Sequence, residues 1–399
     1  MRQLGFALAA AAAAALYAGN PAVAQDKIKI GYVVAKSGPN APGAGITTIP
    51  NYKLWVTDVN AAGGINVGGK KMQIDVVEYD DQSSTEEAVK GIERLATEDK
   101  VDLILPPWGT GTNLAVAPVI AKYGYPHLAV TAATDMAPEM VKRFPNSFWF
   151  LGTSSQGADA LVEVLNKLKA KGLGGNIAMV SVADQFGIEL SKAARPALDK
   201  AGFKLVYDKS YPVTTQDFAP IINEAKAANP DAFVAFSYPP DTFGLTGTAI
   251  ALGFNPKVFY TAVGTAFMVY KDQFKDNVDG VMGVGGVNPD TPEMQAYFKH
   301  HKEVTGQDAD RWASPVTYAS LQILQQAIEK VGSLDKQKIA DAIKAGEFDT
   351  VLGKVKMVNN IRQDVWWAGQ WQGGEFYGLG PTSIAGAKEP LFPKPDWKK

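Results

Sequence analysis

The residue types that most often catalyse reactions occur in this chain without the spacing that catalysis needs. The histidines are His127, His300 and His301, and none belongs to an HExxH pair that could bind zinc. There is no cysteine, which excludes disulfides, thiolate metal ligands and cysteine nucleophiles. We therefore expect neither a metal site nor a cofactor.

Two segments resemble catalytic motifs but differ from them in context. Residues 64–70 (GINVGGK) match the GxxxxGK of a phosphate-binding loop, yet Lys71 replaces the Ser or Thr that would hold magnesium. The segment also leads from a predicted helix into a predicted strand, the reverse of such a loop, so it predicts a β-turn. Residues 152–157 (GTSSQG) lack the GxSxG spacing of a hydrolase nucleophile. The chain is therefore not expected to be an enzyme.

Residues that could bind a carboxylate lie directly after predicted β-strands. In open α/β sheets, ligands bind beyond the carboxyl ends of the strands. In the first half of the chain these positions combine helix starts with hydroxyl groups, a pairing that stabilises anions, at Thr110, Thr112, Thr131 and Thr134. Aromatic rings stand at such positions in Trp108 of the first half and in Phe186, Tyr211 and Tyr238 of the second. Ordinary core packing remains an alternative for each ring taken alone.

These positions follow from an alternation of β-rich and helical runs, which is typical of a parallel sheet covered by helices on both faces. In the first half, strands are expected at residues 27–35, 71–79, 101–105 and 127–130. The apolar spacing of residues 44–60 predicts a helix, and Pro50 limits where it can begin. After Phe150 the alternation restarts, with strands at residues 176–182, 203–209, 232–236 and 257–260. The expected fold class is α/β, with two doubly wound, Rossmann-like lobes.

A late block of helices indicates that the chain crosses between the lobes more than once. Helical patterns return at residues 293–304, 315–331 and 335–344, after both lobes are complete. No linker rich in Gly, Pro or Ser separates the halves, so we expect several short crossings that form a hinge. The expected division is residues 25–152 with 285–351 for lobe I, and residues 153–284 with 352–399 for lobe II.

Composition and the N-terminal segment indicate an exported globular protein. Hydrophobic residues make up 46% and charged residues 20%, and a net charge of -2 offers no basic excess for nucleic acid. Residues 1–24 combine Arg2, an apolar run and the ending Ala22-Val23-Ala24, a pattern typical of a signal peptide cleaved after Ala24. Because no cysteine is available for a lipid anchor, we expect a free periplasmic protein, with simple secretion as the alternative.

Six short motifs occur in an order that points to a known family. They are residues 37–39 (SGP), 60–65 (NAAGGI), 79–82 (YDDQ), 131–134 (TAAT), 184–187 (DQFG) and 348–353 (FDTVLG). Together they make residues 28–371 resemble the type I periplasmic solute-binding proteins of ABC importers, in the branch of the leucine/isoleucine/valine-binding proteins. The resemblance implies the type I periplasmic-binding-protein fold and a monomer that delivers its ligand to a permease in the inner membrane.

The resemblance also implies which residues contact the ligand. In leucine-type members, the first lobe binds the ligand carboxylate through positions that align with Trp108, Gly109, Thr110, Ala132 and Thr134. The second lobe contributes positions that align with Phe186, where Tyr is usual, and with Tyr238.

One aligned position departs from the family pattern. The acidic residue that neutralises the ligand's α-amino group in the family aligns with Val263. A buried ammonium without a partner is strongly unfavourable, so this pocket should disfavour α-amino acids. Asp184 and Asp241 stay open as substitute partners for an amine.

The expected function is therefore that of a substrate-binding protein of an ABC importer. Its ligand is expected to be a small hydrophobic or aromatic carboxylate held between the lobes. A branched-chain or other hydrophobic amino acid is the alternative ligand. A ligand-sensing receptor domain, which would bind in the same way without a permease, is the alternative role.

Overall fold

The first lobe is built on a small, mainly parallel sheet. The computed structural model describes residues 27–398, so the predicted signal peptide lies outside the described residues. The sheet has the order β2-β3-β1-β4, in which β1 pairs in parallel with β3 and β4. Its strands are β1 (Lys27–Val34), β2 (Ile65–Val67), β3 (Lys70–Asp80) and β4 (Leu103–Leu105). A parallel pair, β5 (His127–Ala129) and β6 (Ser147–Trp149), lies beside β4.

The helices of this part follow the predicted alternation. They are α1 (Ala41–Thr47), α2 (Ile49–Ala61), α3 (Thr85–Thr97), α4 (Thr110–Lys122) and α5 (Ala137–Arg143). The single helix expected over residues 44–60 is divided at Thr48, and α2 begins with Pro50 as its second residue, where the missing N–H of proline costs no hydrogen bond. The predicted turn in residues 64–70 is confirmed as the connection of the antiparallel pair β2 and β3.

The second lobe has a larger sheet of order β15-β14-β11-β10-β9-β7-β8. Strands β7 to β11 pair in parallel, and β14 and β15 join the edge as antiparallel strands. The strands are β7 (Asn176–Val182), β8 (Lys204–Tyr211), β9 (Ala232–Phe236), β10 (Val258–Thr261), β11 (Met282–Gly283), β14 (Ala368–Gln372) and β15 (Glu375–Gly380). The helices are α6 (Ser154–Ala170), α7 (Gln185–Lys200), α8 (Ala219–Ala227), α9 (Pro239–Ala251), α10 (Met268–Phe274) and the 3-10 helix η1 (Lys275–Val278).

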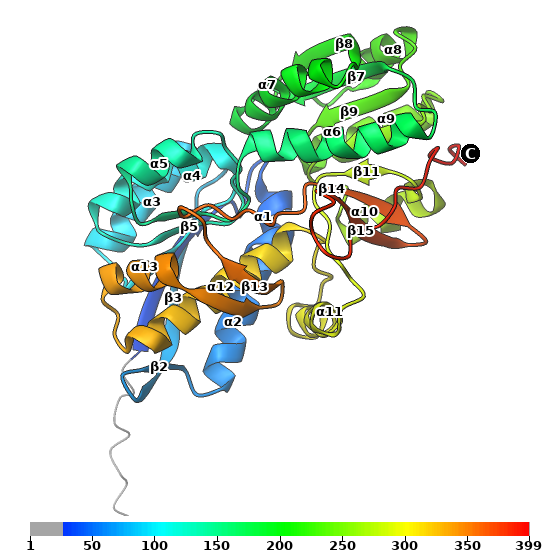
Figure 1. Cartoon of the computed structure of the whole chain (residues 1–399). Coiled ribbons are helices and arrows are strands. Elements are labelled where there is room, and N and C mark those ends of the chain that lie inside the picture. Colours follow the sequence, from blue (N-terminus) through cyan, green and yellow to red (C-terminus); the bar gives the residue numbers. More distant parts are fainter. Residues whose placement is uncertain (1–26, 399) are drawn as a thin grey trace, which may run out of the picture.

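After β11 the chain returns to the first lobe, as Figure 1 shows by the yellow and orange segments beside the blue ones. The returning elements are α11 (Pro292–Thr305), α12 (Ala313–Val331), α13 (Lys336–Ala345), β12 (Glu347–Thr350) and β13 (Gly353–Lys356). Helices α11 and α12 pack against α2 of the first lobe. The predicted two-lobed α/β fold with a late crossing back is thereby confirmed.

Within residues 27–398, three short segments connect the lobes. The first follows β6 and ends at Thr153, whose hydroxyl accepts a hydrogen bond from the Gln156 amide and starts α6. The second lies between β11 and α11, and the third runs from Ile361, which bridges to Trp149 of β6, to β14. The boundary expected between residues 351 and 352 falls inside the turn of the β12–β13 hairpin.

Among residues 27–398, no helix combines the length and apolar character needed to cross a membrane. The same residues contain no group of three or more His, Asp or Glu side chains placed to hold a metal ion.

Candidate functional site

A small cavity lies where the carboxyl ends of the strands in both lobes meet. It is lined by Thr47, Trp108, Gly109, Thr110, Thr131, Ala133, Leu151, Phe186, Tyr238, Val263, Trp312 and Ala313. Six of the residues expected to contact the ligand are thus brought together: Trp108, Gly109, Thr110, Phe186, Tyr238 and Val263. None of the lining side chains carries a charge, so a bound ion would have to be stabilised by dipoles and hydrogen bonds.

Three aromatic rings from the two lobes fill most of this space. The Trp108 ring lies 5.2 Å from the Tyr238 ring across the lobe interface, and Phe186 stacks on Tyr238 at 5.2 Å with an interplanar angle of 16°. The remaining cavity measures about 20 Å³, close to the room needed by one water molecule. A ligand with a ring of its own can therefore enter only when Trp108 and Tyr238 separate.

The start of α4 presents backbone donors at the cavity. Gly109 precedes the helix with a φ of 93°, a conformation that a residue with a Cβ rarely adopts. Thr110, Gly111 and Thr112 form the first turn, where backbone N–H groups have no acceptor within the helix. Because the positive end of the helix dipole adds to these donors, this turn is suited to bind a carboxylate.

A buried hydrogen-bond network holds the loop that carries these donors. The Asn113 side-chain N–H group donates to the carbonyl oxygens of Pro107 and Gly109, each at 2.9 Å. Its oxygen lies 3.0 Å from Nε2 of His127, which must therefore donate the proton. Burial lowers the pKa of His127 to about 3, so the imidazole is neutral and keeps this donor in place.

Trp312 is a cavity residue that the sequence analysis missed. It precedes α12 in the returning segment, and its backbone N–H donates to the buried Asp310 carboxylate at 3.0 Å. Its indole Nε1 is buried and has no hydrogen-bond partner among the described residues. A buried indole N–H normally finds an acceptor, so Trp312 offers one more donor for a ligand. The sequence feature that could have indicated this residue is an aspartate two residues before a tryptophan at a helix start.

Both acidic residues left open as amine partners are committed elsewhere. Asp184 accepts a hydrogen bond from the Gly187 amide at the start of α7, at 2.9 Å, and another from the Tyr238 hydroxyl. Asp241 accepts from the Tyr238 amide at 3.2 Å and from the Tyr211 hydroxyl at 3.3 Å. Neither lines the cavity. Burial raises the pKa of Asp184 above its usual range and that of Asp241 to about 6.

Ala132 and Thr134, which were expected to contact the ligand, do not line the cavity. The loop after β5 presents the alternate residues Thr131 and Ala133 instead, because successive side chains of an extended segment point to opposite sides. Ala132 packs in a separate apolar cluster with Met140 and Trp149.

Thr134 is engaged in a contact between the lobes. Its hydroxyl donates at 2.9 Å to Glu189 of α7, a carboxylate that also accepts from the Asp135 amide at 2.9 Å. The Ser154 hydroxyl donates to the same carboxylate at 3.3 Å. Glu189 therefore ties α7 of the second lobe to the loop after β5 in the first.

Comparison with known proteins decides which family this architecture represents. A family model described as a periplasmic binding protein matches residues 27–375. The chain belongs to the periplasmic binding protein family. Among curated relatives, the Leu/Ile/Val/Thr-binding protein of Salmonella typhimurium is 26% identical over 330 residues, which cover 82% of this chain and 86% of the relative.

Solved structures show the same fold. A solute-binding protein of an ABC transporter from R. palustris, in complex with benzoate, superposes with a TM-score of 0.78 at 20% identity, covering 92% of this chain and 99% of that one. A leucine-binding protein from Thermotoga maritima superposes with a TM-score of 0.75 at 18% identity, covering 90% and 100%.

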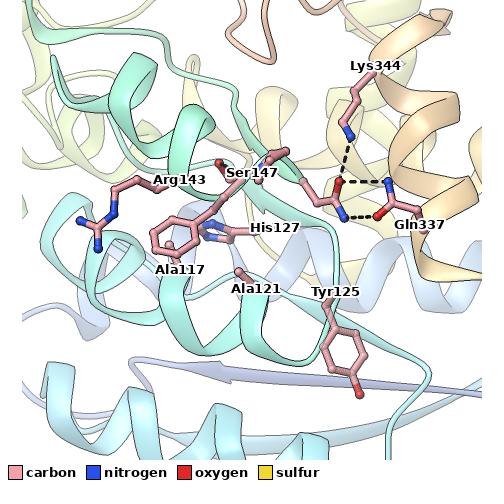
Figure 2. A pocket seen from close by; sticks show the side chains of 11 residues that line it. Ala117, Ala121, Tyr125, His127, Arg143, Ser147, Gln337 and Lys344 are labelled. Atoms are coloured by element: carbon pink, nitrogen blue, oxygen red, sulfur yellow. Dashed lines mark hydrogen bonds between the residues drawn. The ribbon is translucent and has the colours of Figure 1, made fainter.

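A larger cavity of this periplasmic binding protein lies away from the strand ends that ligands use. Figure 2 shows it around His127 and Ser147, the first residues of β5 and β6, with Arg143, Gln337 and Lys344 at its sides. It therefore opens at the amino ends of these strands. The Lys344 ammonium donates to Asn146 at 2.8 Å, and Gln337 bonds to the same side chain. This wall joins α13 to the first lobe and is structural.

Proposed function

We propose that this protein captures a small hydrophobic or aromatic carboxylate between its lobes and delivers it to an ABC permease. The observation that carries the proposal is the composition of the cavity: unpaired backbone donors at the start of α4, three aromatic rings, and no charged side chain. The protein acts by binding alone and carries out no reaction.

The proposed ligand contacts divide between the two ends of such an acid. The carboxylate binds at the first turn of α4, beside Gly109 and Thr110, and accepts the Trp312 indole N–H. The apolar part lies between Trp108 of lobe I and the stacked pair Phe186 and Tyr238 of lobe II, with Val263 against its edge. We place lobe I at residues 27–152 with 285–361 and lobe II at residues 153–284 with 362–398, because the β12–β13 hairpin and Ile361 belong with β6.

Relatives support both an acid and an amino acid as the ligand class. Structural neighbours from Rhodopseudomonas palustris were crystallised with benzoate and 4-hydroxybenzoate, whereas curated relatives are named for leucine, isoleucine and valine. Val263 and the occupied carboxylates of Asp184 and Asp241 favour the acid here. An ammonium needs an acceptor or a negative charge, and Val263 presents an isopropyl group to the cavity instead.

A melting experiment with matched ligands tests this proposal. Benzoate and 4-hydroxybenzoate should raise the melting temperature, while leucine, isoleucine and valine should have little effect. A ligand present at about 1,000 times its dissociation constant adds roughly 4 kcal/mol to the free energy of unfolding, which a melting scan detects. Tight binding of leucine with no response to benzoate would refute the proposed ligand class.

The variant Val263→Glu sharpens the same experiment. It places a carboxylate where the family neutralises an amine, so benzoate should bind more weakly through charge repulsion and leucine should gain affinity. Val263→Leu keeps the wall apolar and serves as the control, with the preference for acids retained. If both variants prefer benzoate as the native protein does, Val263 does not decide selectivity.

Export and partnership are parts of the same proposal. We infer a periplasmic monomer whose signal peptide is cleaved after Ala24, so the intact mass of the exported protein should correspond to a chain beginning at Gln25. An ABC permease distinguishes an importer from a sensor. Uptake of labelled ligand into vesicles that contain the permease should require this protein, and binding without any uptake would favour the sensor.

A further inference from the structure

A third cavity lies at the third connection between the lobes, away from the ligand residues. It measures about 340 Å³ and is formed by β13, by the segment leading to β14 and by the loop after β15. Its polar lining consists of Lys354, Lys356, Arg362, Asp364 and Ser383, with Trp366 as an apolar wall. Cationic side chains therefore outnumber acidic ones in this cavity.

Arg362 is the most unusual member of this set. Only 6% of its surface is exposed, and its side chain makes one hydrogen bond, from Nη2 to the carbonyl oxygen of Asp364. Its Nε is buried without any partner among residues 27–398, and no carboxylate there lies within ion-pair distance of the guanidinium. A guanidinium has five N–H donors, and the hydrogen bond to the Asp364 carbonyl uses one of them.

Arg311 is an equally buried arginine whose guanidinium is paired by other residues of the chain. It is also 6% exposed, and its Nε and Nη2 bond to the two oxygens of Glu375 at 2.7 and 3.2 Å. Its Nη1 donates to the Ala309 carbonyl at 2.7 Å. Because burying an unpaired charge is strongly unfavourable, the contrast indicates that Arg362 lacks a partner that the chain itself does not supply.

Of the charged groups around Arg362, Lys356 adds positive charge, and the Asp364 carboxylate offsets part of it. Lys356 is exposed and has no ion-pair partner in the described part of the chain, whereas Lys354 is held by Asp349 at 2.9 Å. Asp364 is exposed, and burial lowers the pKa of Arg362 only to about 10, so the guanidinium stays charged at neutral pH. The Ser383 hydroxyl has no hydrogen-bond partner among the described residues and is free to donate.

We propose that this cavity is a binding site for a small oxyanion, such as sulfate, phosphate or a short carboxylate, held by Arg362 with Lys356 and Ser383. A planar guanidinium pairs well with two oxygens of one anion, which would satisfy the unused donors. The site is separate from the cavity around Trp108 and does not depend on the function proposed above. Because it joins β13 to the loop after β15, an anion bound there also joins the two lobes.

Thermal unfolding and titration calorimetry with inorganic sulfate test the proposal. Ionic strength is held constant with chloride, so that general screening does not change between samples. Sulfate should stabilise the native protein, and Arg362→Gln should bind it at least about tenfold more weakly, because a hydrogen bond to a charged group is lost. Parallel titrations with acetate and with phosphate show which oxyanion binds the cavity most tightly. Equal responses of the native protein to sulfate and chloride would overturn the site.

Three further variants keep the test decisive if Arg362→Gln folds poorly. Lys356→Gln changes an exposed side chain and should weaken sulfate binding several-fold. Lys299→Gln removes an exposed charge of α11 outside the cavity and should leave sulfate binding unchanged. Trp108→Ala, which alters only the other cavity, should also retain the sulfate response. Loss of the response in Trp108→Ala, or equal effects of Lys356→Gln and Lys299→Gln, would refute the assignment.

Discussion

The indole N–H of Trp312 provides a strict test of how the carboxylate is bound. The variant Trp312→Phe removes this donor and keeps an aromatic ring beside Trp367, whose centroid lies 5.5 Å away. A hydrogen bond to a charged group contributes about 1.5–3 kcal/mol, so benzoate should bind about 10 to 150 times more weakly. Calorimetry of benzoate binding measures this change.

Trp367 supplies a matched control because its indole Nε1 is also buried without a partner among the described residues, yet it does not line the cavity. Trp367→Phe loses the same atoms from the same tilted pair of rings. Both variants should therefore change the free energy of unfolding by similar amounts, while Trp367→Phe leaves benzoate affinity nearly unchanged.

The neutral ligand benzamide separates charge from shape. Its carbonyl oxygen can still accept a hydrogen bond, but a bond between neutral groups contributes only about 0.5–1.5 kcal/mol. Trp312→Phe should consequently weaken benzamide binding less than benzoate binding. Equal losses for both ligands, or equal losses in Trp312→Phe and Trp367→Phe, would show that Trp312 acts by packing and not by donating to a carboxylate.

Three other predictions follow from the lobe interface and its buried acids. Small-angle scattering should show a more compact protein with saturating benzoate than without it, and identical curves would mean that the lobes do not move. Glu189→Gln should weaken benzoate binding about tenfold, because the hydroxyl of Thr134 and the amide of Asp135 lose a carboxylate acceptor. Unchanged affinity would show that this contact does not favour closure. Burial raises the pKa of Asp241 to about 6, against 3.8 for an aspartate in an unfolded chain. The protonated side chain therefore stabilises the protein at low pH, and this contribution is lost as the pH rises from about 4 through about 6. Between pH 4 and pH 7, the free energy of unfolding should therefore decrease less in Asp241→Asn than in the native protein, by up to about 3 kcal/mol. Urea unfolding at both pH values measures this difference.

The parts of the site that the sequence predicted are those set by local rules. Residues after a parallel strand lie at the ligand-binding edge, and Trp108, Phe186 and Val263 line one cavity there. The same rule does not determine which of two neighbours points inward. Ala132 and Ala133 differ only in register, and the conformation of the loop after β5 decides between them.

Residues that reach the site through long-range packing were not predictable in this way. Trp312 follows no strand, and it meets the cavity because α12 packs against α2 after the second crossing. Arg362 has an ordinary sequence context, and its unpaired state appears only when the third connection is folded beside β6. Both contacts join residues far apart in the chain, and no periodicity of the sequence encodes them.

The contact between Trp108 and Tyr238 links ligand selectivity to lobe closure. These rings belong to opposite lobes, and while they are in contact they leave too little space for the ring of a ligand. A ligand that enters must replace their contact by two new ones, so its own apolar surface becomes part of the interface that holds the lobes together. A flat aromatic acid can stack against Trp108 on one side and Tyr238 on the other, whereas a short aliphatic acid buries less area on both. Closure should therefore be more favourable with benzoate than with a small aliphatic acid that presents the same carboxylate to α4.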